Sequence, residues 1–359
     1  MTTTANRAAL LAEHCEKLSS ESFLGTFNAQ DLLDWVELEL GNRNVLDDFV
    51  PFGTTGKLSM AIPNEPILHI LSGNTPHAGM QSLLRGLLIG ASNLVKLPSH
   101  SSPKVIDWID GLPPALRELV IVLDDLYDEA FYSAKTVIAI GSDDTMNKIQ
   151  SRISPQQRFI PHGHKLSIGL VKTASRETAQ LVVQDACAFN QQGCLSLHTV
   201  YVIDGAREFL PMLADAMREY EVVNPRGEIG ISESGAISNL REMVKYEAAN
   251  DPENTALKHS EGNTKWTAVY RNSPTLTPSV LNRVVTVQPW PSSNELSELG
   301  AERDFISTMA VESSLLNKGK FFDVPRICPL GESQMPSLTW HHDGFAPLGS
   351  LVRWRDIDS

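Results

Sequence analysis

The chain has 359 residues, of which 42% are hydrophobic and 20% charged. This composition is typical of a globular protein, and the length predicts two domains rather than one. A formal charge of −13 argues against a general nucleic-acid binder, which needs a dominantly basic surface. The sequence lacks an apolar stretch of membrane-spanning length and its start does not resemble a signal peptide, so we expect a cytoplasmic protein.

Residues 1–60 are acidic and are expected to form a largely helical lead-in. From residue 61 to 165, short apolar runs alternate with amphipathic ones, which is the pattern of βαβ units on a parallel sheet. The expected strands are 66–71, 93–97, 119–123, 136–140 and 158–161, and the expected helices include 80–88, 105–109, 125–133 and 146–153. These elements predict one five-stranded, doubly wound domain.

A second set of elements occupies residues 166–325. The expected strands are 166–171, 200–203, 266–270 and 284–288. One helix is expected after the first of these strands and ends near residue 191. Three further helices are expected over 206–220, 233–250 and 293–316. A C-terminal segment rich in Pro and Gly follows over 326–359. The predicted fold is therefore α/β, with two doubly wound lobes and a cleft between them.

Four cysteines, Cys15, Cys187, Cys194 and Cys328, show no CxxC pair, so we expect reduced thiols and no structural zinc. Cys194 stands out because it follows Gln191-Gln192-Gly193, where a helix is expected to end. A thiol beside an open backbone turn can attack a carbonyl carbon while nearby N–H groups face the oxygen. The alternative is a small buried hydrophobic side chain, since free cysteine is commonly buried.

Loops that directly follow strands of an open parallel sheet are where ligands bind. Asn74 follows the first strand and its amide could hold an oxyanion. Lys96 and Ser99 follow the second strand and suit a ribose or a phosphate. Gly141 and Ser142 precede a helix, a position that binds anions. Each group also has a structural interpretation, as a turn residue, a solvated cation or a helix cap.

Charge near these loops is uneven. No acidic residue lies between Asp144 and Glu177, and the cations there are Lys148, Arg152, Arg158, Lys165, Lys172 and Arg176. Such a basic island could attract a polyphosphate cofactor, although a solvated basic face explains it equally well. Asp143 and Asp144, in contrast, favour the helix-cap interpretation of Ser142, because they would repel a phosphate there.

Two histidine pairs, His162 with His164 and His341 with His342, raise the question of a metal. On a strand, positions i and i+2 share a face, so the first pair could ligate one ion. The spacing places no third ligand beside them. We therefore expect hydrogen-bonding or surface roles for these histidines and no metal.

The order of several short motifs resembles one known family. The motifs are His69-Ile70-Leu71-Ser72-Gly73-Asn74-Thr75-Pro76, Asn93-Leu94-Val95-Lys96-Leu97-Pro98-Ser99, Gly141-Ser142-Asp143-Asp144-Thr145, His162-Gly163-His164-Lys165-Leu166-Ser167, Gln191-Gln192-Gly193-Cys194-Leu195-Ser196 and Arg326-Ile327-Cys328-Pro329-Leu330-Gly331, followed by Trp340-His341-His342-Asp343-Gly344 and Arg353-Trp354. Together they resemble the bacterial acyl-CoA reductases of the bioluminescence type (LuxC-like), a branch of the aldehyde dehydrogenase superfamily.

The resemblance implies roles for particular residues. Cys194 corresponds to the nucleophile that forms an acyl-enzyme, and Asn74 to the side chain that helps to hold the oxyanion. Lys96 and Ser99 correspond to the site of the adenosine ribose. Ser99 stands where NAD-preferring relatives commonly have a glutamate, so NADPH is the expected cofactor. The superfamily also implies a homodimer.

Departures from the superfamily pattern bear on the reaction. Residues 161–165 lack the glutamate that activates water for deacylation, and residues 279–283 lack the one that binds the nicotinamide ribose. An acyl-cysteine without a base for water is expected to wait for hydride, which favours reduction of an acyl-CoA or a carrier-protein thioester to an aldehyde. Two alternatives stay open: a non-catalytic, reductase-like binding protein, and a cysteine acyltransferase without a redox step.

Overall fold

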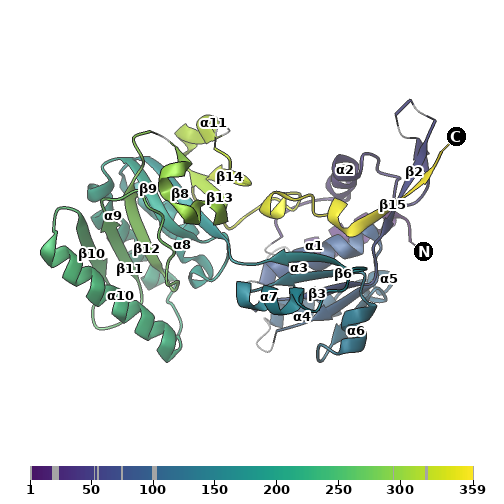
Figure 1. Ribbon diagram of the computed structural model, residues 1–359, viewed down its shortest axis with the longest axis horizontal. Coiled ribbons are helices and arrows are strands. Elements are labelled where there is room, and N and C mark those ends of the chain that lie inside the picture. Colours follow the sequence, from purple (N-terminus) through teal and green to yellow (C-terminus); the bar gives the residue numbers. More distant parts are fainter. Residues whose placement is uncertain are drawn as a thin grey trace. The chain divides into compact units, whose positions relative to one another are not determined.

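The computed structural model describes residues 2–17, 24–51, 53–54, 56–73, 76–98, 103–293, 295–319 and 322–358. The chain forms two compact units (Figure 1). Unit 1 consists of Met1–His164 together with Ser337–Ser359, and unit 2 consists of Lys165–Pro336. The segment 326–359, which the sequence presents as one C-terminal piece, is therefore divided between the units.

Unit 1 contains a parallel sheet with the strand order β5-β4-β3-β6-β7. Its strands are β3 (Ile67–Ile70), β4 (Asn93–Lys96), β5 (Val120–Leu123), β6 (Thr136–Ile140) and β7 (Arg158–His162). Its helices are α3 (Pro76–Ile89), α4 (Pro103–Asp110), α5 (Pro114–Arg117), α6 (Asp128–Ser133) and α7 (Asp143–Gln150). All five strands expected from the apolar runs are present, and the order is that of a doubly wound nucleotide-binding half.

The core of unit 1 forms around α3. Its residues Met80, Leu83, Leu84, Leu87 and Leu88 recur at helical spacing and are all buried. Two N-terminal helices, α1 (Thr4–Lys17) and α2 (Ala29–Leu40), contribute to the same hydrophobic cluster. The lead-in is thus part of the core of unit 1.

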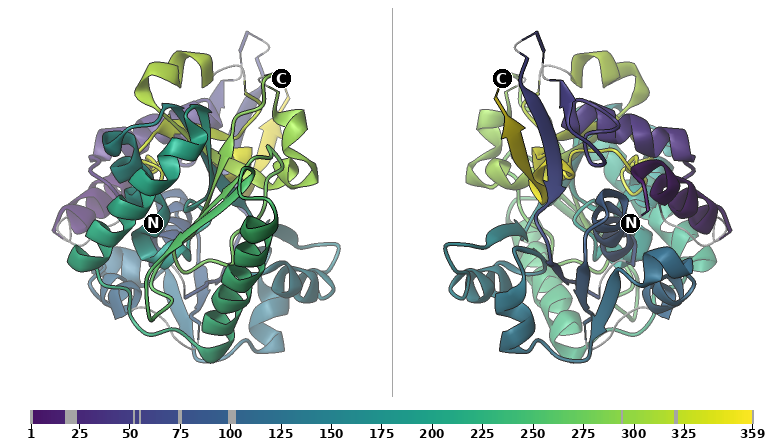
Figure 2. Two further views of the ribbon diagram at one scale, coloured as in Figure 1. Left: turned by 90° about the vertical axis from the view of Figure 1, so that its left-hand side faces the viewer. Right: turned by 90° about the vertical axis from the view of Figure 1, so that its right-hand side faces the viewer.

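A small antiparallel sheet joins the two ends of the chain. It pairs β1 (Val50–Pro51), β2 (Leu58–Pro63) and β15 (Val352–Ile357), with β2 in the centre. Figure 2 shows β2 and β15 side by side. The expectation of a largely helical residue range 1–60 is therefore wrong for its last part, because these residues form strands once β15 supplies a partner.

Unit 2 contains a seven-stranded sheet with the order β10-β11-β12-β9-β8-β13-β14, in which only β10 is antiparallel to its neighbour. The strands are β8 (Leu166–Thr173), β9 (Leu197–Asp204), β10 (Thr255–His259), β11 (Thr267–Arg271), β12 (Val284–Pro289), β13 (Ile306–Val311) and β14 (Arg326–Pro329). The main helices are α8 (Arg176–Cys187), α9 (Ala206–Val223) and α10 (Ile231–Asn250). The sequence did not predict β10 or β14.

The prediction of a long helix over 293–316 is wrong. In its place are two short 3-10 helices, η2 (Leu296–Leu299) and η3 (Ala301–Phe305), then β13, then η4 (Ser313–Leu315) and α11 (Leu316–Gly319). Gly300, with φ of 84°, ends η2, and all six residues of β13 are buried between β8 and β14. A strand covered on both faces shows a continuous buried run rather than alternation, which is why periodicity misjudged it.

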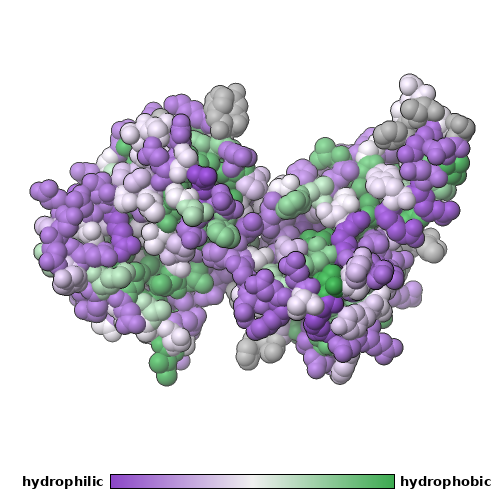
Figure 3. All heavy atoms as spheres, viewed as in Figure 1, coloured by the Kyte–Doolittle hydropathy of each residue, from purple (hydrophilic) through white to green (hydrophobic). Residues whose placement is uncertain are grey.

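Hydrophilic side chains dominate the visible face of both units (Figure 3), in keeping with the acidic composition. Among the described residues, no helix has both the length and the apolar character needed to cross a membrane.

Candidate active site around Cys194

Cys194 lies on a turn between α8 and β9. The helix ends at Cys187, earlier than expected, and η1 (Ala188–Gln191) leads to the turn. Phe189, Asn190 and Gln191 have φ of 50°, 55° and 64°, which is left-handed backbone that side chains other than Gly, Asn and Asp rarely adopt. Backbone strain of this kind is usually held in place by the surrounding structure and is common near functional sites.

The buried side chain of Gln191 holds this strained segment. Its Nε2 donates to the carbonyl oxygens of Leu197 (2.7 Å) and Val284 (2.8 Å), and its Oε1 accepts from the Val284 N–H (2.9 Å). Three bonds from one amide tie the segment before Cys194 to β9 and β12. The sequence predicted a glutamine-rich helix end here, but it did not predict that the glutamine bonds both strands.

All four cysteines lie in the described part of the chain, and Cys194 alone is partly exposed. Burial raises the pKa of Cys15 and of Cys328 to about 11, and that of Cys187 to about 12. These three thiols stay protonated at neutral pH and are poor nucleophiles. The accessible thiol is therefore the one that the sequence singled out.

Side chains from distant parts of unit 2 fix the turn that carries Cys194. The Ser196 N–H donates to the Gly193 carbonyl (3.0 Å) and closes the turn. Ser167 on β8 donates from Oγ to the Cys194 carbonyl (2.7 Å), and Gln334 donates from Nε2 to Ser196 Oγ (3.1 Å). The backbone at Cys194 thus has anchors on both sides.

The loop 331–334 that reaches this turn is held by Asp185 of α8. Its carboxylate accepts from the N–H of Gly331 (2.7 Å) and of Ser333 (2.9 Å). Burial raises the pKa of Asp185 to about 6, although the two N–H bonds act in the opposite direction. Gly331 has φ of 88°, and a Cβ there would lie 2.8 Å from Leu181, so the loop requires glycine at this position.

Arg326, the first residue of β14, binds the same loop. Its guanidinium donates to the carbonyl of Ser333 (2.7 Å) and to that of Glu332 (2.9 Å), and it interacts electrostatically with Cys194. Sequence reasoning assigned no role to Arg326 or Asp185. The available signals were the position of Arg326 at the head of a family motif and an acid within the apolar run of α8.

The predicted cofactor residues lie in unit 1. Lys96 ends β4, and its Nζ donates to the Asp124 carbonyl after β5 (3.0 Å), so the cation lies at the carboxyl edge of the sheet. Ser142 caps α7 by accepting from the Thr145 N–H (3.4 Å), with Gly141 just before it. Asn74 and Ser99 lie outside the described residues.

Several cations of the basic island have partners. Lys148 pairs with Asp144 (2.7 Å), Arg152 with Asp128 (2.7 Å) and Arg176 with Glu219 (2.6 Å). Arg158 donates to the carbonyls of Ser350 and Val352 in the C-terminal segment. These contacts favour the structural interpretation of the island over a polyphosphate site.

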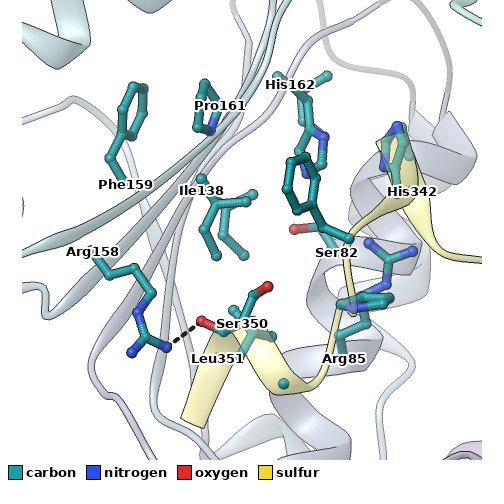
Figure 4. Close-up of a pocket in the computed structure, with 16 residues that line it drawn as sticks. Ser82, Arg85, Ile138, Arg158, Phe159, Pro161, His162, His342, Ser350 and Leu351 are labelled. Carbon is teal, nitrogen blue, oxygen red and sulfur yellow. Dashed lines mark hydrogen bonds between the residues drawn. The ribbon is translucent and has the colours of Figure 1, made fainter. Parts of the chain in front are cut away.

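Unit 1 also has a cavity of about 490 Å³, a size that suits a small organic ligand (Figure 4). Its walls come from α3, from β6 and β7, and from the C-terminal segment. Most of the lining is apolar, including Ile138, Ile140, Phe159 and Leu351, and the buried Arg85 also lines it. Such a space can hold an apolar group.

Beside this cavity, the structure brings together His162, His342 and Asp343. His162 Nδ1 lies 2.9 Å from Asp343 Oδ2, and the two imidazole rings stack with centroids 4.1 Å apart and planes 11° apart. Burial and the neighbouring His162 lower the pKa of His342 well below its usual value. The lone pair of an imidazole lies in the ring plane, so one ion cannot lie in both of these nearly parallel planes.

The fold is found in solved structures. A benzaldehyde dehydrogenase from Corynebacterium glutamicum aligns with a TM-score of 0.66 and 14% identity, over 100% of this chain and 85% of that one. Proline utilization A from Bradyrhizobium japonicum aligns with a TM-score of 0.69 and 15% identity, over 99% of this chain but only 43% of that longer one. With a parallel sheet in unit 1 and a sheet in unit 2 that is parallel except for β10, the chain therefore has an aldehyde dehydrogenase fold.

Sequence similarity identifies the family of this chain among proteins with the aldehyde dehydrogenase fold. A profile of the acyl-CoA reductase (LuxC) family matches residues 4–354. The long-chain acyl-protein thioester reductase 2 of Photobacterium leiognathi is 25% identical, over 90% of this chain and 70% of its own length. The long-chain acyl-protein thioester reductase of Aliivibrio fischeri is also 25% identical, with the same coverage. The chain belongs to the acyl-CoA reductase (LuxC) family, which places it among the oxidoreductases.

Proposed function

We propose that the protein reduces an acyl thioester to an aldehyde with NADPH, through an acyl group carried on Cys194. The observation that carries this proposal is the partly exposed Cys194 on a turn with hydrogen-bonded anchors, in a chain whose other three thiols are buried. The names of the relatives, thioester reductases, support the same reaction class.

In the first step, the Cys194 thiolate attacks the carbonyl carbon of the thioester. The tetrahedral intermediate expels the carrier as a thiolate, which takes a proton, and an acyl-Cys194 thioester is left. NADPH, when bound, supplies the hydride that reduces this thioester. The resulting thiohemiacetal oxyanion reforms its carbonyl, expels the Cys194 thiolate and releases the aldehyde. Backbone N–H groups at the turn and the Asn74 amide are the proposed oxyanion donors.

Water has to be kept from the acyl-enzyme for reduction to prevail. The segment between Asp144 and Glu177, which includes residues 161–165, has no acidic side chain. A carboxylate base in this segment would activate water against the acyl group. The lack of a carboxylate base in this segment supports reduction of the acyl-enzyme over its hydrolysis.

For the cofactor, we propose a site at the carboxyl edge of the sheet of unit 1. Lys96 is suited to a ribose or a phosphate, because its ammonium is fixed at that edge through the Asp124 carbonyl. Ser99 is the second proposed contact. Gly141 and Ser142 suit an anion less well, because the Ser142 hydroxyl already caps α7 and Asp143 and Asp144 stand in the first turn.

The scheme is tested by intact mass after incubation with octanoyl-CoA or tetradecanoyl-CoA without cofactor. We expect one added acyl group, located on Cys194 by peptide mapping, and its loss as aldehyde when NADPH is added. Cys194→Ala should remain unmodified, whereas Cys328→Ala, which removes a buried thiol, should still be acylated. An unmodified wild-type protein would contradict the proposal.

The same experiment separates the alternatives. Acylation without consumption of NADPH, followed by transfer to an added thiol, would indicate an acyltransferase. No acylation and no change in NADPH fluorescence would indicate a non-catalytic binding protein. A carrier protein in place of CoA as donor, a homodimer and a cytoplasmic location remain predictions.

A further inference from the structure

The register of three strands places Arg326 on the face of the sheet that carries the Cys194 turn. Ser167 on β8 is aligned with Thr308 on β13, and Thr308 with Arg326 on β14. Aligned residues of neighbouring strands point to the same face, and two strand spacings amount to about 9.6 Å. The Ser167 side chain contacts the Cys194 carbonyl, so the Arg326 side chain leaves the sheet on that side.

Hydrogen bonds fix the guanidinium of Arg326. It donates to the Ser333 and Glu332 carbonyls at 2.7 Å and 2.9 Å. The same loop contacts the Cys194 turn through Gln334 and Ser196. Burial lowers the pKa of Arg326, and nearby negative groups, Cys194 among them, act in the opposite direction. A guanidinium keeps its charge at neutral pH, so a fixed cation is held on the loop that contacts the Cys194 turn.

Two acidic groups in this region, Asp185 of α8 and Glu332, oppose the positive charge of Arg326. Cys328 on β14 is a buried thiol whose pKa is raised to about 11, so it stays protonated at neutral pH. Glu332 is exposed, so solvent screens its charge. Asp185 accepts two backbone N–H groups, which offset part of its negative charge. Screening and these hydrogen bonds weaken the opposition of the two acidic groups to the positive charge of Arg326.

We propose that Arg326 is a positioning residue whose fixed charge stabilises the Cys194 thiolate over the thiol. The thiol proton passes to solvent before the thioester arrives, and the anion that remains is the attacking species. This inference rests on the proposed function in one respect, the role of Cys194 as the nucleophile.

The test is the pH dependence of Cys194 alkylation by iodoacetamide, with the modified residue identified by peptide mass. In Arg326→Gln we expect the midpoint to rise, since a nearby opposite charge favours the charged form of an ionisable group and this variant removes it. Arg326→Lys should recover part of the shift. Arg176→Gln, which removes an exposed cation paired with Glu219, should leave the midpoint unchanged.

If Arg326→Gln does not fold, Arg326→Met is a second uncharged variant, which keeps an apolar side chain in place of the aliphatic part of arginine. The Tm of each variant shows whether it is folded. A wild-type midpoint in a folded neutral variant, or an equal rise in Arg176→Gln, would overturn the inference. Alkylation needs neither acyl donor nor NADPH. If acyl-CoA fails to modify Cys194 while Arg326→Gln still moves the midpoint, the proposed function fails and the electrostatic role of Arg326 stands.

Discussion

At the scale of single residues, buried neutral histidines stand out in unit 1. His69 is fully buried, with Nδ1 2.8 Å from Ser82 Oγ and Nε2 3.0 Å from Asn93 Oδ1. The Asn93 amide nitrogen donates to the Ala91 and Leu119 carbonyls, so its oxygen faces the imidazole. Nε2 therefore carries the proton, and Nδ1 accepts from Ser82. Burial lowers the pKa of His69 to about 4.

This burial makes stability depend on pH. Between pH 6.5 and pH 4 the unfolded chain binds a proton at His69 and the native chain does not, so the free energy of unfolding falls as the pH falls. Each such proton contributes a slope of up to about 1.4 kcal/mol per pH unit. His77, whose pKa burial also lowers to about 4, acts with the same sign.

We predict that His69→Gln loses less stability than the wild type between pH 7 and pH 5. Urea unfolding at several pH values measures this slope. His341→Gln, which replaces an exposed histidine, is the matched control. Parallel curves for wild type and His69→Gln would show that His69 is not the titrating group.

At the scale of elements, glycines decide how closely α3 approaches the sheet. A Cβ on Gly86 would lie 2.0 Å from Asn93 Oδ1 on β4 and 3.4 Å from His69 on β3. Both of those side chains are buried and hydrogen-bonded to each other, so neither can move without breaking the bond. Gly235 in α10, in contrast, has nothing within 4 Å of its Cβ position.

Alanine at these two positions should have opposite effects. Gly86→Ala is expected to lower the free energy of unfolding by about 1–3 kcal/mol, as overpacking does. Gly235→Ala should raise it by about 0.5–1 kcal/mol, because alanine favours a helix interior over glycine. Chemical denaturation of both variants measures the difference. A Gly86→Ala protein as stable as the wild type would show that α3 does not pack against β3 and β4 as closely as described.

At the scale of the whole molecule, unit 1 is built from both ends of the chain. Leu338, Leu348, Leu351 and Val352 of the C-terminal segment are buried in the same cluster as α1, α2 and α3. Glu39 of α2 also accepts from the N–H groups of Leu348 and Gly349. These contacts predict that the last residues stabilise unit 1 and contribute little to unit 2.

Removal of residues 337–359 is expected to destabilise unit 1 selectively. In limited proteolysis, cleavage should appear in residues 1–164 earlier than in residues 165–336, because the deletion opens the core of unit 1. The intact chain is the control. Earlier cleavage in residues 165–336 would contradict the division of the chain into these units.

The sequence alone determined the positions of elements with a strong local signal. The five strands of unit 1 and the helices α3 and α9 have periodic apolar residues or β-branched runs bounded by Gly, Pro and Asp, and each of these signals acts over a few residues. The order of short motifs was likewise enough to identify the fold and the family, and it selected Cys194, the thiol that is least buried.

Only the tertiary structure decided the remaining strands and the side-chain contacts described above, because the residues that contact one another there are distant in the chain. The segment 306–311 is a strand since β8 and β14 pair with it, and residues 58–63 pair with residues 352–357. The stack of His162 on His342, and the bond from Ser167 to the Cys194 carbonyl, join residues that no local pattern links. Local propensity cannot specify such contacts, since each forms only when the chain between the two residues has folded.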